Sequence, residues 1–97
     1  MYNDILKTFL SENIKRLNDL KKYKENSDLS NYAILSHSIK SDSKYLGFTT
    51  LADIAYKHEM SGKENNKEYI DNYYDEFIKE LNKITDIANK YIKSLEE

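Results

Sequence analysis

The chain of 97 residues contains no cysteine and no proline, and its only glycines are Gly47 and Gly62. Without cysteine it has no disulfide, no thiol nucleophile and no thiolate metal site. No apolar stretch approaches the roughly 20 residues of a membrane-spanning helix, and the first residues lack the basic and apolar regions of a signal peptide. We therefore expect a cytoplasmic protein that does not enter a membrane.

Neither sign of charge is in large excess, because the chain has 15 lysine and arginine residues and 17 aspartates and glutamates. This balance argues against a general nucleic-acid-binding protein, which would carry a basic surface. With 33% charged residues, 39% hydrophobic residues and almost no helix breakers, the composition is that of a folded helical protein. The length suits one domain, residues 1–97, and leaves no room for a nucleotide-binding kinase domain.

Apolar residues recur every three or four positions in four stretches, which predicts four amphipathic helices. The first is expected over about residues 2–24. Ser27 or Asp28 is a suitable N-cap for the second, expected over residues 29–46. Gly47 stands where a glycine commonly ends a helix.

Turn and cap residues also delimit the last two helices. Thr50 and Asp53 have the spacing of a capping box, so they are predicted to begin the third helix, which residues 61–62 end. Asn65 and Glu68 have the same spacing and are predicted to begin the fourth, which reaches the end of the chain. Because the connections are short, neighbouring helices should be antiparallel. The expected fold is an all-α, up-down-up-down four-helix bundle with a long C-terminal helix.

One side of each predicted helix is expected to face the core. His58 falls on this side, so we interpret it as a core histidine with a hydrogen-bond partner. Three of the nine tyrosines, Tyr32, Tyr73 and Tyr91, also fall on it, which favours core packing over stacking on nucleic acid. The other inward residues expected are Leu6, Phe9, Leu10, Ile14, Leu17, Leu20, Tyr23, Leu29, Ser36, Ile39, Ser43, Leu46, Leu51, Ile54, Ala55, Ile70, Phe77, Leu81, Ile84, Ala88 and Leu95.

His37 is predicted to lie on the outer face of the second helix, about 100° or more from its inward residues. Ser41 lies about 40° to one side of it and Lys40 about 60° to the other, and Lys44 falls two turns further on, nearly in line. Asp42 lies about 140° away, too far round to cancel the lysine charges. An exposed imidazole therefore stands beside fixed positive charge.

This pattern is typical of chemistry in which a histidine accepts a phosphoryl group. A histidine with the ordinary pKa of about 6.5 is mostly neutral near pH 7, and its free ring nitrogen is a nucleophile. Nearby lysines stabilise the charge of phosphohistidine and of the transfer that forms it. The small Ser41 leaves room for a partner, to which Ala33, Ile34 and Phe48 offer an apolar rim.

The stretch from His37 to Gly47 resembles the signature of histidine phosphotransfer (HPt) domains, approximately His-x-Leu/Ile-Lys-Gly-x-Ser/Ala-x-x-Leu-Gly. Glu59 follows where the family often has Glu or Gln. The likeness extends to the HPt domains of hybrid sensor kinases and chemotaxis kinases, and it implies a four-helix bundle that acts as a phosphorelay intermediate. The matching residues are His37, Ile39, Lys40, Ser43, Leu46 and Gly47.

The resemblance also implies roles for single residues. His37 would accept the phosphoryl group on Nε2, with Lys40 facing the phosphate and Lys44 adding positive charge. Glu59 would bind the other ring nitrogen and fix the tautomer. Ser41 departs from the family pattern, which has glycine four residues after the histidine. Because the serine side chain is small, phosphoryl transfer should still proceed, but more slowly.

The implied partners are a histidine kinase and the receiver domain of a response regulator, which would supply Mg²⁺, since the sequence shows no acidic metal cluster or nucleotide-binding motif. We expect no cofactor, no enzymatic activity of its own and a monomer. Two alternatives stay open. In the first, the chain is a helical docking module that is never phosphorylated. In the second, it is the HPt domain of a larger histidine kinase.

Overall fold

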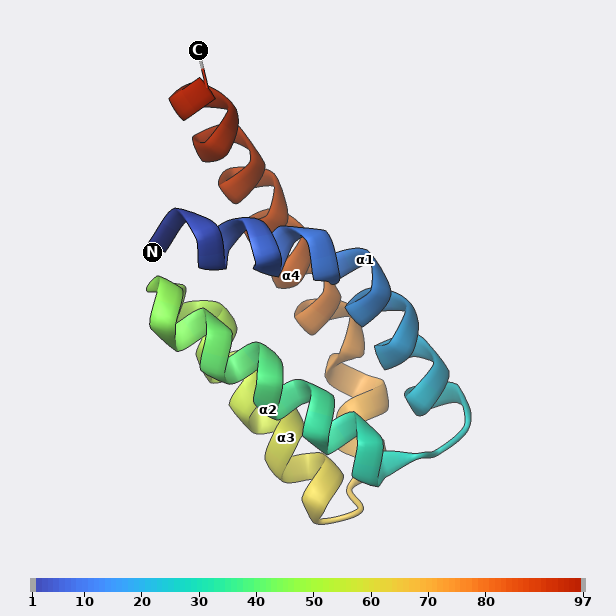
Figure 1. The fold of residues 1–97 in the computed structure, drawn as a ribbon. Helices are drawn as coiled ribbons and strands as arrows, with labels where there is room; N and C mark the ends of the chain where they lie inside the picture. The colour runs from blue at the N-terminus through green and yellow to red at the C-terminus, as the bar shows by residue number, and fades with distance from the viewer. Residues whose placement is uncertain (1, 97) are drawn as a thin grey trace.

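The computed structural model describes residues 2–96, which form four α-helices around one core (Figure 1). Each helix packs against the ones before and after it in the chain, and α4 closes the bundle against α1. The prediction of an all-α, antiparallel four-helix bundle is confirmed. The helices are α1 (Tyr2–Glu25), α2 (Leu29–Leu46), α3 (Thr49–Lys63) and α4 (Lys67–Glu96).

The predicted boundaries of α2 are confirmed at both ends. Asp28 is its N-cap, and the Asp28 carboxylate accepts from the backbone N–H of Asn31. Gly47 ends the helix in the left-handed region at φ 88°, a conformation that favours glycine because it has no Cβ. The backbone N–H of Phe48 then donates to the carbonyl of Ser43 at 2.8 Å, which closes the last turn.

The predicted starts of α3 and α4 are wrong. Phe48 is the N-cap of α3 and makes no side-chain hydrogen bond, so Thr50 does not begin a capping box. The N-cap side chain of α4 is Asn66, whose Oδ1 accepts from the backbone N–H of Tyr69 at 3.1 Å. The cap lies one residue late because α3 continues to Lys63 and Asn65 takes a left-handed turn conformation at φ 57°, which asparagine tolerates.

The core is formed by the predicted side of every helix, and α2 follows the prediction at all six of its inward positions. Ser36 and Ser43 are fully buried there, as the spacing requires. The buried hydrophobic cluster consists of Leu6, Phe9, Leu20, Leu29, Tyr32, Ile39, Leu46, Leu51, Ala55, Ile70, Phe77, Leu81, Ile84 and Ala88.

Four predicted core residues are instead exposed: Ile14, Tyr73, Tyr91 and Leu95. On α1, the buried positions near Ile14 belong to the polar residues Asn13 and Arg16. Both have polar partners on other helices, which is why burial is tolerated; Asn13, for example, donates to the Thr85 hydroxyl at 2.8 Å.

The two exposed tyrosines of α4 lie at opposite ends of that helix. Tyr73 packs its ring on Tyr69, with centroids 4.5 Å apart, at the edge of the core. Tyr91 lines an apolar hollow of about 400 Å³ between the start of α1 and residues 87–91 of α4, together with Tyr2 and Phe48. Beyond it, α4 projects past the other helices (Figure 1). Among residues 2–96, no helix is long and apolar enough to span a membrane.

Candidate functional site

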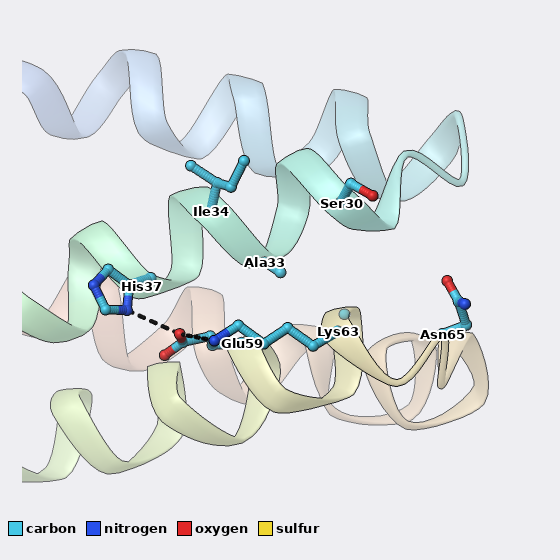
Figure 2. Close-up of a pocket in the computed structure, with 8 residues that line it drawn as sticks. Ser30, Ala33, Ile34, His37, Glu59, Lys63 and Asn65 are labelled. Carbon is cyan, nitrogen blue, oxygen red and sulfur yellow. Dashed lines mark hydrogen bonds and ion pairs between the residues drawn. The ribbon is translucent and has the colours of Figure 1, made fainter.

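The site is built where α2 and α3 pack most closely. Gly62 on α3 lies against α2, and a Cβ added there would be only 2.9 Å from the Ala33 Cβ and from the Leu29 carbonyl oxygen. This close approach brings the side chain of Glu59 under His37, and Nδ1 of the imidazole lies 2.8 Å from Oε2 of the carboxylate (Figure 2). His37 itself is 56% exposed, so its ring is open to solvent while Glu59 is buried.

Glu59 is the centre of a charged cluster. Lys40 Nζ lies 2.8 Å from Oε1, and Lys63 Nζ lies 2.9 Å from Oε2, the same oxygen that binds His37. Burial by itself raises the pKa of Glu59, but the hydrogen bonds from Lys40, Lys63 and His37 outweigh it and lower that pKa to about 2. The carboxylate is therefore ionised throughout the physiological range.

The charge of Glu59 decides the tautomer of His37. An ionised carboxylate can only accept hydrogen bonds, so the proton of the neutral imidazole must be on Nδ1. The lone pair is then on Nε2, the ring nitrogen that points away from Glu59 in Figure 2. The geometry presents an exposed nitrogen nucleophile whose proton is held on the opposite side of the ring.

The three predicted supporting residues on α2 differ in how they are held. Lys40 is 15% exposed and lies between Glu59 and the ring of Tyr56, whose centroid is 5.4 Å from Nζ. Lys44 and Ser41 are exposed, and Lys44 makes no ion pair with any side chain between residues 2 and 95. Lys40 is thus fixed charge, whereas Lys44 is a free surface lysine.

A hollow of about 580 Å³ lies beside the imidazole, between the first turns of α2 and the end of α3 (Figure 2). Ala33 and Ile34, the two predicted partner-docking residues of α2, line it, and Ile34 is 67% exposed. Phe48 does not, because it packs on Phe9 of α1 with ring centroids 6.0 Å apart and lines the other hollow. The structure therefore does not bring Phe48 into this hollow beside Ala33 and Ile34, because the turn after Gly47 directs it toward α1, and its predicted part in docking a partner stays a prediction.

The second histidine, His58, is a core histidine with a hydrogen-bond partner, as predicted. It is fully buried, and its Nδ1 lies 2.9 Å from the hydroxyl oxygen of Tyr32. Burial lowers the pKa of His58 to about 4, an effect only partly offset by the backbone of Tyr73, and burial also raises the pKa of Tyr32. The Tyr32 hydroxyl therefore keeps its proton and donates a hydrogen bond to the neutral imidazole of His58. The His58 ring also packs on the ring of Phe77, with centroids 4.6 Å apart.

Sequence reasoning missed Lys63. It follows Glu59 by four residues on one helix face, the spacing of a stabilising glutamate–lysine pair, and this signal was available in the sequence. What the sequence could not show is that the same carboxylate oxygen also meets His37 on another helix.

The buried network of Arg16 was also missed. Its guanidinium lies 2.6 Å from the Asp42 carboxylate, 3.1 Å from Glu12 and 3.3 Å from the Ser38 hydroxyl. In the sequence, only the four-residue spacing of Glu12 and Arg16 indicated part of this network. The contact joins α1 to α2 and holds the carboxylate of Asp42 on the α1 side of the helix, where it does not oppose the lysine charges.

Among the side chains of residues 2–95, no group of three or more histidine, aspartate or glutamate residues is placed to hold a metal ion. The family model described as Hpt domain matches residues 4–89 of the chain. No curated protein and no solved structure matches it. The chain therefore belongs to the Hpt domain family, whose members are phosphocarriers of two-component signalling and interact with kinases and receiver domains.

Proposed function

We propose that the single domain of residues 1–97 carries a phosphoryl group on Nε2 of His37. It would receive the group from a histidine kinase or a receiver domain and pass it to the receiver of a response regulator. The observation that carries this proposal is the hydrogen bond of 2.8 Å between His37 Nδ1 and the ionised Glu59, because it leaves Nε2 as the exposed nucleophile.

The transfer step follows from this tautomer. The lone pair of Nε2 attacks the phosphorus of an aspartyl phosphate, the P–O bond to the aspartate breaks, and the aspartate leaves as a carboxylate. Because the attacking ring keeps its Nδ1 proton, it becomes positively charged as the N–P bond forms. Glu59 stabilises that charge through the Nδ1–H bond, and in the reverse step the ring becomes neutral again.

The supporting residues act on the phosphoryl group and on the partner. In this proposal Lys40 and Lys44 supply positive charge near the phosphate, and the small side chain of Ser41 leaves space for the approaching receiver. Ala33 and Ile34 give that receiver an apolar contact at the hollow, where Ile34 is well exposed. In this proposal the receiver brings the Mg²⁺ and the aspartate, the chain has no kinase activity of its own, and it acts in the cytoplasm as a monomer.

A receiver domain charged with phosphate tests the proposal directly. We expect the chain to gain one phosphate that is labile in acid and stable in base, and His37→Gln to gain none. His58, the only other histidine, is fully buried and serves as an internal control, since it stays present in His37→Gln. With ATP and no kinase, neither protein should be labelled.

Two other outcomes have separate readings. If the chain binds receivers but never accepts phosphate, it is a docking module and the proposal fails. If phosphate moves to His37 only when the chain is joined to a kinase, the chain is the HPt domain of a larger kinase, and the chemistry of His37 is kept.

A further inference from the structure

The two lysines that meet Glu59 are held very differently. Lys40 is 15% exposed, and both Glu59 and the ring of Tyr56 contact its ammonium group. Lys63 is 58% exposed, and its ammonium group is held by Glu59 alone among the described residues. Figure 2 shows its side chain extended along α3 toward Glu59, beside the hollow that His37 also lines. Lys63 can therefore leave the carboxylate at little cost, and Lys40 cannot.

The charges of the cluster change when His37 carries phosphate. With neutral His37, the two ammonium groups and the carboxylate leave one net positive charge. The phosphoryl group brings nearly two negative charges on the far side of the same ring, more than the single positive charge that the ring gains. Lys63 shares Oε2 with His37 and has three N–H donors on a flexible stem, so it can exchange that oxygen for a phosphoryl oxygen while Lys40 and the imidazole still hold Glu59.

Resting on the function proposed above, we propose that Lys63 is a phosphate-contacting residue of this site. In the free protein it neutralises Glu59, and in the phosphorylated protein it moves to the phosphoryl oxygens, whereas Lys40 contributes its positive charge without leaving Glu59. The phosphoryl group then meets a mobile cation from α3, Lys63, in addition to Lys40 and Lys44 from α2.

Phosphoramidate tests this without any partner protein. Nε2 of His37 attacks its phosphorus, the P–N bond breaks and ammonia leaves. We expect Lys63→Gln to slow this labelling and to shorten the lifetime of the phosphohistidine, each by about three- to tenfold. This range lies between the effect of losing an exposed ion pair and the effect of losing a charge-assisted hydrogen bond.

Two further variants serve as controls. Lys63→Arg keeps the charge and should stay within about twofold of the native protein. Lys57→Gln makes the same charge change on α3 at an exposed lysine without an ion pair among the side chains of residues 2–95, and it should also stay within that range. If Lys63→Gln matches Lys57→Gln, the inference is wrong.

A second measurement separates contact with phosphate from an effect through Glu59. The ¹⁵N shifts of the His37 ring report its tautomer, and we expect Lys63→Gln to keep the proton on Nδ1 because Lys40 still holds Glu59. Loss of that tautomer would mean that Lys63 acts only by positioning the carboxylate, which overturns the inference but leaves His37 as the phosphoacceptor. If the native protein takes up no phosphate at all, the proposed function falls as well.

Discussion

Glu59 concentrates more interactions than any other side chain of the site, because a buried carboxylate meets a histidine and two lysines. Its folded pKa of about 2 lies below the ordinary value of 4.5. The stability that this group contributes is therefore complete above pH 4.5 and is lost as the pH falls toward 2. The charge of one residue thus links the tautomer of His37 to the acid stability of the domain.

Replacing Glu59 with glutamine should remove this pH dependence. We expect Glu59→Gln to lower the free energy of unfolding by about 2–3 kcal/mol at pH 7, since Lys40 loses its buried partner. Between pH 4.5 and 2 the native protein should lose stability more steeply than the variant, as measured by urea denaturation. Glu64→Gln, an exposed carboxylate at the end of α3, is the matched control and should keep the native slope. Parallel slopes for all three proteins would contradict the prediction.

His58 should govern stability in a higher pH range. Its folded pKa of about 4 lies below the ordinary 6.5, so the unfolded chain binds the proton first and stability falls as the pH drops from 6.5 toward 4. His58→Leu should abolish that loss and also cost about 1–3 kcal/mol at pH 7, because the Tyr32 hydroxyl is left buried without its partner. Adding Tyr32→Phe should recover most of this cost. An undiminished slope in His58→Leu would show that another group is responsible.

At the scale of the elements, the contact of α2 with α3 sets the geometry of the site. Gly62 stands inside α3, where alanine would be favoured by about 1 kcal/mol on helix propensity alone. Its place against Ala33 and the Leu29 carbonyl reverses that preference, since a Cβ would come within 2.9 Å of both. Helix propensity and helix packing therefore make opposite predictions for one substitution.

We expect Gly62→Ala to destabilise the protein by about 1–3 kcal/mol despite its better propensity, because α2 and α3 must separate. Urea denaturation measures the change, and the ¹⁵N shifts of His37 should show a weaker bond to Glu59. Combining it with Ala33→Gly should restore only part of the stability, since the Leu29 carbonyl still blocks the new methyl group. A stabilised Gly62→Ala variant would mean that the helices do not approach this closely.

At the scale of the whole molecule, α4 is longer than the bundle requires. Its middle is buried at Phe77 and Leu81, whereas Leu95 near its end is 54% exposed. Folding energy from apolar burial therefore comes from the middle of α4 and much less from its end.

Removing residues 94–97 should change the free energy of unfolding by less than about 0.5 kcal/mol, whereas Leu81→Ala should cost about 2–5 kcal/mol. Phosphoramidate labelling of His37 should be unchanged by the deletion. Sedimentation should give both the full and the shortened chain the mass of one copy, 11.5 kDa for the full chain. A dimer that the deletion dissociates would show that the end of α4 is an interface.

Much of this architecture could be predicted from local patterns. The inward positions of α2 follow from helical spacing, and Gly47 marks its end because the left-handed conformation there favours glycine. The outward direction of His37 follows from the same spacing. On α1 the error falls where a polar residue replaces an apolar one in the core, as Asn13 does beside the exposed Ile14. Hydrophobic spacing does not reveal a polar side chain whose partner lies on another helix.

The sequence by itself determined the four helices, the exposed histidine and the lysines that follow it, since these depend on spacing within one helix. Only the tertiary structure decided that Glu59 meets His37, Lys40 and Lys63 together, and that Phe48 turns away from them. The physical reason is that charge pairing across helices depends on how closely two backbones approach. Here that approach is set by Gly62 against Ala33, a contact between residues 29 positions apart.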